Sequence, residues 1–285
     1  MTLSLTQSQG AALWQVAEAL ADAARLATLR HFRQPGLDAA NKDQGSGYDP
    51  VTIADREAEA AMRALLADLR PDDAILGEEA GHQTGTTGLT WVLDPIDGTR
   101  GYLSGTPTWG VLIALCAQDG PVLGIIDQPY IGERFYGGLG RAQVTGPQGS
   151  RALAARPARP LAEATLFTTF PEIGTSAERA AFERVRDRVR LTRYGTDCYA
   201  YALLAAGQID LVIEAGLGAH DIAAPIAVIQ AAGGIVTDWQ GRPAHGGGRA
   251  LAAANPVIHA QALALLQGGL PDDLPDDLRA GGGAA

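Results

Sequence analysis

The sequence predicts a mixed α/β (α+β) protein made of two different halves. In the first half, short apolar runs follow one another across short connections, which is typical of antiparallel strands. In the second half, helical and strand patterns alternate, which indicates a layered α/β arrangement. The chain has 285 residues, 46% of them apolar, and can therefore bury a sizeable core, as one large domain or as two joined halves.

Two helices separated by a loop are expected at the start of the chain. Apolar residues recur at helical spacing over 11–33, where Gly and Pro are absent, and predict the first helix. A polar, Gly-rich loop is expected over 38–50. The second helix is expected over 53–69, with Thr52 as its cap and Met62 on its buried stripe.

Four apolar runs predict the strands of the first half, at 90–94, 109–115, 121–127 and 133–138. The stretch 146–160 is rich in Gly, Pro, Ala and Arg, so we place the boundary between the halves there, giving 1–150 and 151–268. The acidic tail 269–285, rich in Gly and Ala, is expected to be disordered.

The second half predicts three helices and three strands in alternation. The expected order is a helix over 179–189, a strand over 189–195, a helix over 196–207, a strand over 209–216, a helix over 221–234 and a strand over 235–239. Gly207 is expected to end the middle helix, because glycine readily adopts the backbone conformation that terminates helices.

Charge and composition exclude several classes of partner. The net charge is −10 without a basic stripe, which argues against nucleic acid and anionic membranes. Apolar runs are too short to span a bilayer, and the first basic residue is Arg25, so we expect a cytoplasmic protein without a signal peptide. Cys116 and Cys198 belong to no metal-type cluster and are expected to be reduced. Lys42 is the only lysine, either by chance or because a compact ammonium is needed beside anions.

The stretch WVLDPIDGTRGYLSG, residues 91–105, places two carboxylates at the end of an apolar strand. Asp94 and Asp97 lie on one tight turn, so their side chains can converge. Converging carboxylates repel one another unless a cation lies between them, and such oxygen ligands suit Mg²⁺. The amides of residues 98–100 would begin a short helix and favour an anion such as phosphate. An Asx-turn with a helix cap is the simpler alternative.

Four further acidic residues lie next to apolar runs or at expected helix starts. Glu78 and Glu79 follow the apolar run AILG, whereas Asp55 and Asp221 begin helices. Each has a simpler alternative when taken alone. The glutamates would form a solvated turn, and the aspartates would interact favourably with a helix dipole.

Three segments together resemble the inositol monophosphatase family of lithium-sensitive, Mg²⁺-dependent phosphatases. They are GEE, DPIDGT and HDIAAPIAVIQAAGGIVTDWQG, and their order and spacing fit from about Lys42 to Gly241. The resemblance implies a layered α/β/α/β/α sandwich with the active site between the halves. It also implies a small phosphomonoester substrate, two or three Mg²⁺ ions per site and a homodimer.

The resemblance implies roles for individual metal ligands. Glu78, Asp94 and the carbonyl of Ile96 would hold one Mg²⁺ ion. Asp94, Asp97 and Asp221 would hold a second. The histidines show no metal-binding spacing, which agrees with a site made of oxygen ligands.

The resemblance also implies catalytic and phosphate-binding residues. Glu78 and Thr99 would orient a metal-bound water, and Asp55 would support them. The amides of Gly98 and Thr99 would hold the phosphate. The metal ions would neutralise the phosphoryl oxygens and lower the pKa of the bound water. Supporting roles would fall to Lys42 and Glu79.

Two segments, GTRGYLSGTPTWG and YGTDCYAYALLAAGQIDLVIEAGLGAHD, resemble the histidinol-phosphatase branch. That branch has an acidic residue at the position of Asp197, where inositol phosphatases usually have a small one. L-Histidinol phosphate carries an ammonium and an imidazole, for which Asp197 and Glu214 would provide two carboxylates. Glu214 discriminates less, because inositol-specific members also have it, and Asp197 has a plain helix-start acid as its alternative. Arg100 is expected to contact phosphate or close the pocket.

The sequence therefore predicts a Mg²⁺-dependent phosphomonoesterase of histidine biosynthesis, which hydrolyses L-histidinol phosphate to L-histidinol and phosphate with a metal-activated water. One alternative is an inositol-1-monophosphatase or a related sugar or nucleotide phosphatase. Another is an inactive metal-binding relative. That last alternative predicts a lost metal ligand, whereas every expected position is filled here.

Overall fold

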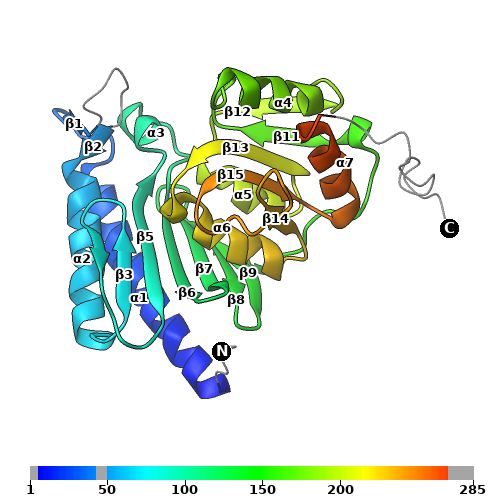
Figure 1. Ribbon diagram of the computed structural model, residues 1–285. Coiled ribbons are helices and arrows are strands. Elements are labelled where there is room, and N and C mark those ends of the chain that lie inside the picture. The colour runs from blue at the N-terminus through cyan, green and yellow to red at the C-terminus, as the bar shows by residue number, and fades with distance from the viewer. Residues whose placement is uncertain (1–5, 43–49, 269–285) are drawn as a thin grey trace.

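The computed structural model describes residues 6–42 and 50–268 (Figure 1). The helices are α1 (Gln7–His31), α2 (Ile53–Leu69), α3 (Thr99–Leu103), α4 (Ser176–Arg186), α5 (Cys198–Ala205), α6 (Ala219–Ala231) and α7 (Pro256–Leu266), with a short 3₁₀ helix at Leu161–Glu163. The strands are β1 (Ala39–Asn41), β2 (Pro50–Thr52), β3 (Ala74–Gly77), β4 (Gly81–Gln83), β5 (Thr90–Asp97), β6 (Gly110–Ala117), β7 (Gly120–Gln128), β8 (Glu133–Gly138), β9 (Arg141–Gly146), β10 (Gly149–Ala152), β11 (Thr165–Thr168), β12 (Leu191–Tyr194), β13 (Leu211–Leu217), β14 (Ile235–Thr237) and β15 (Gly248–Ala253).

Helices and sheets alternate in five layers (Figure 1). Helices α1 and α2 pack on one face of an eight-stranded sheet through a core that includes Leu20, Met62 and Trp91. Helices α5 and α6 fill the space between that sheet and a five-stranded sheet. Helices α4 and α7 cover the outer face of the five-stranded sheet, around Phe182 and Ile258. This arrangement confirms the expected α/β/α/β/α sandwich.

The eight-stranded sheet has the order β10-β9-β8-β7-β6-β5-β3-β4. Its neighbours from β5 to β10 are antiparallel, as the short connections predict, and all four expected strands of the first half are present. Strand β3 runs parallel to β5. The prediction of a loop over 38–50 is wrong at its ends, because β1 and β2 pair there. Residues 43–49 lie outside the described residues.

The five-stranded sheet has the order β12-β11-β13-β15-β14 and mixes parallel with antiparallel pairs. All six elements expected in the second half are present, with bounds shifted by a few residues. Strand β10 occupies Gly149–Ala152, inside the stretch 146–160, and the chain reaches the second sheet only at β11. The division at residue 150 stays a prediction, and the tail 269–285 lies outside the described residues.

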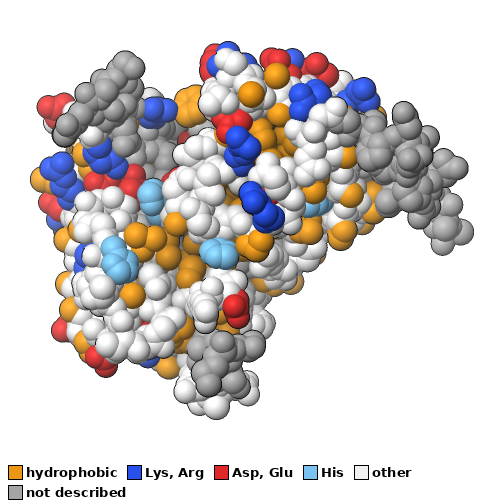
Figure 2. Space-filling model, in the orientation of Figure 1, with side chains coloured by type: hydrophobic (Ala, Val, Ile, Leu, Met, Phe, Trp, Pro, Cys, Tyr) orange, Lys and Arg blue, Asp and Glu red, His pale blue; other side chains and the backbone are white. Residues whose placement is uncertain are grey.

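The face of the molecule drawn in Figure 2 shows how the charged side chains are distributed there. On the face shown in Figure 2, Lys and Arg side chains are interspersed with Asp and Glu and do not form one patch. Among the described helices, none combines the length and the apolar character that crossing a membrane requires.

Helix α6 lies directly against the eight-stranded sheet because two strands carry glycine beneath it. A Cβ atom on Gly124 would lie 2.5 Å from the carbonyl oxygen of Ala224, and one on Gly137 would lie 2.2 Å from the Cα of Val228. Such distances are too short for any side chain. This close contact fixes the position of α6, whose first turn carries Asp221 to the end of β5.

Replacing Gly137 with Ala is expected to reduce the free energy of unfolding by about 2 kcal/mol or more, because the new methyl group must push α6 from the sheet. Gly246→Ala is the control, since an added Cβ there meets no described atom within 4 Å. Urea unfolding of both variants measures the difference. Equal stability of the two would contradict the close approach of α6.

Candidate active site

The site begins where β5 departs from regular pairing. Asp94 pairs with Leu112 and Asp97 with Gly110, so two residues of β5 lie opposite one residue of β6 between these pairs. This bulge bends the strand and re-aims its side chains. The backbone N–H of Ile96 donates to Asp94 Oδ1 at 3.0 Å and fixes the Asp94 side chain within the bend.

Three aspartates from two parts of the chain meet beside this bulge. Asp94, Asp97 and Asp221 each place a carboxylate oxygen within 4.8 Å of the other two, and Asp94 is only 1% exposed. Asp97 accepts the backbone N–H of Cys198 at 2.6 Å, and Asp221 accepts that of Gly218 at 2.6 Å. Each carboxylate is thus oriented by a backbone donor.

The carboxylates disfavour one another's charge. Burial raises the pKa of Asp94 well above its ordinary value, and the charges of Glu78, Asp97 and Asp221 add to this shift. Burial also raises the pKa of Asp97, as do the charges of Asp197 and Asp221. A divalent cation bound among these oxygens would remove the repulsion. The donor set therefore fits a hard metal ion such as Mg²⁺.

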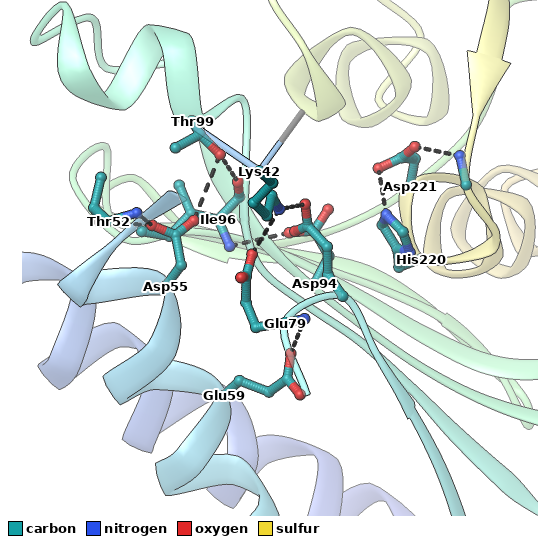
Figure 3. Close-up of polar contacts among 12 residues, drawn as sticks. Lys42, Thr52, Asp55, Glu59, Glu79, Asp94, Ile96, Thr99, His220 and Asp221 are labelled. Carbon is teal, nitrogen blue, oxygen red and sulfur yellow. Dashed lines mark hydrogen bonds and ion pairs between the residues drawn. The ribbon is translucent and has the colours of Figure 1, made fainter. Parts of the chain in front are cut away.

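Glu78 lies next to this cluster, at the end of β3. Its backbone N–H donates to the carbonyl oxygen of Leu93 at 3.1 Å, which aligns it with the neighbouring strand β5. Lys42 Nζ donates to Glu78 Oε1 at 2.7 Å and to Glu79 Oε1 at 2.9 Å (Figure 3). Although burial opposes its charge, these bonds raise the pKa of Lys42 above its ordinary value. The single lysine therefore lies between two anions.

Asp55 and Thr99 form a second hydrogen-bonded group beside the cluster (Figure 3). Thr52 caps α2, and Asp55 Oδ2 accepts its backbone N–H at 2.8 Å and its hydroxyl at 2.6 Å. The Thr99 hydroxyl lies 3.5 Å from Asp55 Oδ1 and 3.1 Å from the carbonyl oxygen of Ile96. Because the Thr99 hydroxyl donates its hydrogen to these acceptors, its oxygen can accept a hydrogen bond from a water molecule.

A cavity of about 420 Å³ opens beside these groups. Among its lining residues, one group belongs to the metal and phosphate side, namely Glu78, Asp97, Gly98, Thr99 and Asp221. A second group comes from α5, β13 and the neighbouring loops, namely Thr169, Phe170, Asp197, Tyr201 and Glu214. Arg100 also lines the cavity, and its guanidinium lies 5.0 Å from the centre of the Phe170 ring.

Asp197 and Glu214 are the carboxylates of the second group. Asp197 has a backbone φ of 45°, in a region that favours glycine, and Gly98 faces it so closely that a Cβ atom there would lie 2.8 Å from Asp197 Cγ. Burial raises the pKa of Asp197 to about 6, although Arg100 opposes the shift. Glu214 accepts the Thr169 backbone N–H at 2.7 Å, yet burial raises its pKa to about 7. Both carboxylates would be stabilised by a cationic ligand.

Two residues at the site, Tyr201 and Glu59, went unrecognised in the sequence. The hydroxyl of Tyr201 is buried and makes no hydrogen bond within residues 6–42 and 50–268, although its ring lines the cavity. Nothing in the helical pattern of α5 distinguishes it from a core residue. Glu59 lies one turn after Asp55 on α2 and contacts the Glu79 backbone (Figure 3). The spacing of four residues places both on one helix face and is a usable signal.

A family model described as "Inositol monophosphatase family" matches residues 11–269. The chain belongs to the inositol monophosphatase family. The curated relatives include the bifunctional phosphatase IMPL2, chloroplastic, of Arabidopsis thaliana, which is 44% identical over 80% of this chain and 64% of its own length. The histidinol-phosphatase of Mycobacterium tuberculosis is 35% identical over 88% of this chain and 97% of its own. The solved inositol monophosphatase from Zymomonas mobilis is 39% identical, with a TM-score of 0.78 over 89% of this chain and 96% of its own.

Inositol monophosphatase family members are metal-dependent phosphatases that act on small phosphomonoesters, and the acidic cluster of this chain agrees with that chemistry. The structure brings every residue that the resemblance singled out into one region. Eight of them line the cavity, namely Glu78, Asp97, Gly98, Thr99, Arg100, Asp197, Glu214 and Asp221. The others lie behind that wall and contact it or one another, namely Lys42, Asp55, Glu79, Asp94 and Ile96.

Asp94→Asn is expected to stabilise the metal-free protein at pH 7 by roughly 1 kcal/mol or more, because it removes one charge from a buried, repelling cluster. The same substitution should abolish the rise in melting temperature that added Mg²⁺ gives the wild type. Thermal unfolding with and without chelator measures both effects. Asp68→Asn, at an exposed position, is the control. An Asp94→Asn protein that Mg²⁺ stabilises fully would contradict the metal assignment.

Glu214 predicts a specific pH dependence of stability. Its pKa rises from 4.5 to about 7 on folding, so the folded protein binds the proton more tightly and loses stability as pH increases across this interval. The contribution is on the order of 3 kcal/mol. Urea unfolding of the wild type and Glu214→Gln in chelator, from pH 5 to 8, isolates it as the difference between two curves. Parallel curves would contradict the raised pKa of Glu214.

Proposed function

We propose that this protein hydrolyses L-histidinol phosphate to L-histidinol and phosphate, with Mg²⁺ as its metal. The observation that carries the proposal is the pair of carboxylates on the cavity wall formed by α5 and β13, namely the half-buried Asp197 and the buried Glu214. A phosphate bound at the cluster would direct its leaving group toward that wall. An ammonium and an imidazole would there meet two negative charges.

The metal ligands in this proposal are Glu78, Asp94, the carbonyl of Ile96, Asp97 and Asp221. Two or three Mg²⁺ ions held by them would neutralise the phosphoryl oxygens and lower the pKa of bound water. Their donor chemistry suits this role, because the cluster is rich in carboxylate oxygens, with Asp94 buried and Asp97 and Asp221 partly buried, and their charges repel one another.

The protein's own groups orient the reactants. The Thr99 hydroxyl accepts a hydrogen bond from the attacking water and donates to Asp55, which Thr52 holds in place. The backbone amides of Gly98 and Thr99 donate to the phosphate at the start of α3. Glu78 completes the orientation of the water. Catalysis then depends on positioning and on charge neutralisation rather than on a side-chain nucleophile.

The leaving-group wall supplies specificity in this proposal. Asp197 binds the ammonium, and the buried hydroxyl of Tyr201 lies on the same wall with Glu214. Arg100, stacked on Phe170 at the cavity, closes the pocket over the phosphate. A neutral polyol would bring no positive charge to Asp197. The M. tuberculosis relative named histidinol-phosphatase supports this choice.

A second candidate is the hydrolysis of inositol 1-phosphate. The Z. mobilis neighbour is named an inositol monophosphatase and is 39% identical to this chain. Glu214 could accept hydrogen bonds from ring hydroxyls as readily as it could bind a cation.

We also propose a homodimer, as the family resemblance implies.

The decisive experiment compares phosphate release from L-histidinol phosphate and from inositol 1-phosphate by the same preparation, with and without excess chelator. We expect kcat/KM to favour L-histidinol phosphate at least tenfold and chelator to abolish both activities. An equal or reversed preference would overturn the proposed substrate. Undiminished activity in chelator would overturn the metal mechanism.

Asp197→Asn is expected to lower kcat/KM for L-histidinol phosphate by roughly 10- to 100-fold, because it removes one charge-assisted hydrogen bond to the ammonium while preserving side-chain shape. The value for inositol 1-phosphate should stay within about twofold, which makes that substrate the internal control. Steady-state kinetics on both esters gives the comparison. A uniform loss on both esters would instead place Asp197 in the common phosphate or metal machinery.

A further inference from the structure

We propose that Glu59 is a positioning residue, which holds the turn after β3 so that Glu78 faces the metal site. Glu59 lies on α2 and is 1% exposed. Its Oε2 accepts the backbone N–H of Glu79 at 2.7 Å, and its Oε1 accepts that of Ala80 at 3.0 Å (Figure 3). The carboxylate therefore binds the backbone of the two residues that follow Glu78.

Glu78 is held from its other side by the sheet. Its own N–H donates to the carbonyl oxygen of Leu93 at 3.1 Å, one residue before Asp94. The backbone of Glu78 is thus fixed between strand β5 and the carboxylate of Glu59. Both constraints determine the direction in which the Glu78 side chain points from the backbone.

Arg63 completes this arrangement one turn further along α2. Its Nε donates to Glu59 Oε1 at 2.7 Å, and another of its nitrogens donates to the carbonyl oxygen of Gly81. A buried carboxylate is costly unless its hydrogen-bonding capacity is satisfied. Glu59 has three donors, and two of them belong to the turn itself.

Gly77 makes room for the carboxylate. A Cβ atom at this position would lie 2.1 Å from Glu59 Oε1 and 2.7 Å from Arg63 Nη2. The last residue of β3 therefore has to lack a side chain for Glu59 to reach the turn.

One face of α2 thereby serves two parts of the site. Asp55, Glu59 and Arg63 are spaced by four residues and lie on the same side of the helix. Asp55 contacts Thr99, and Glu59 contacts the turn that carries Glu78. The helix thus sets the water-orienting pair and a metal ligand in one rigid frame. The inference rests on the role of Glu78 as a metal ligand in the proposed function, and not on the identity of the ester.

The test measures Mn²⁺ binding to the full chain by titration calorimetry, without substrate. Glu59→Gln is expected to raise the Mn²⁺ concentration for half-saturation by roughly tenfold or more, because misplaced supporting groups weaken metal sites by 10- to 100-fold. Gly77→Ala, which displaces the Glu59 carboxylate without removing it, should shift the same value in the same direction. This second variant keeps the test valid if Glu59→Gln does not fold.

Asp73→Asn is the matched control. Asp73 is also 1% exposed and binds an arginine, Arg70, together with the indole of Trp91, and neither partner is a residue of the metal site. It should lower the melting temperature while leaving Mn²⁺ affinity within about twofold. An unchanged Mn²⁺ affinity in folded Glu59→Gln would overturn the inference. A shifted affinity would support it whichever ester the enzyme prefers, and a wild type that binds no Mn²⁺ would overturn it together with the metal assignment.

Discussion

The mutual repulsion of buried carboxylates is the constraint on which this structure depends. Asp94, Asp97 and Asp221 would separate if their side chains were free, because each charge raises the free energy of the others in a poorly solvated space. The protein keeps them together with backbone N–H donors from three different places in the chain. These donors bind one oxygen of each carboxylate and leave the rest available. The fold thus prepares a cation site at the expense of its own stability.

That preparation requires rigid layers. Asp94 and Asp97 lie on β5, whereas Asp221 comes from the first turn of α6 and the donor to Asp97 from the first turn of α5. The two helices lie between the sheets, so their ends cannot move without disturbing the core that they share with both sheets. Glycines beneath α6 allow the closest approach of helix and sheet. Packing far from the cavity therefore determines the distances between the charged groups.

Much of this could be predicted from the sequence, and the limits have physical causes. The cap at Thr52 and the strand that ends in Asp94 have strong local signals, and the structure contains both, with the strand continuing to Asp97. Strand β15 is rich in alanine, and β3 and β11 have four residues each, so tertiary pairing rather than local preference makes them strands. The contact of Glu59 with the β3 turn joins segments whose proximity no local pattern specifies. The family resemblance supplied the grouping of distant acids, which spacing alone leaves open.

In the proposed function, one wall of the cavity carries the groups for the reaction, and another wall carries the groups that select the substrate. In this proposal, the acidic cluster and the start of α3 bind the phosphate, which all candidate substrates share. In the same proposal, the wall with Asp197 and Glu214 contacts the alcohol that leaves. Because Asp197 adopts a strained backbone conformation and presses against Gly98, its carboxylate has little freedom to turn away from the cavity. An amino-acid substitution on that wall can therefore change which ester is bound while the metal ligands stay in place. Relatives with one metal centre and different substrates are what this division of the site would produce.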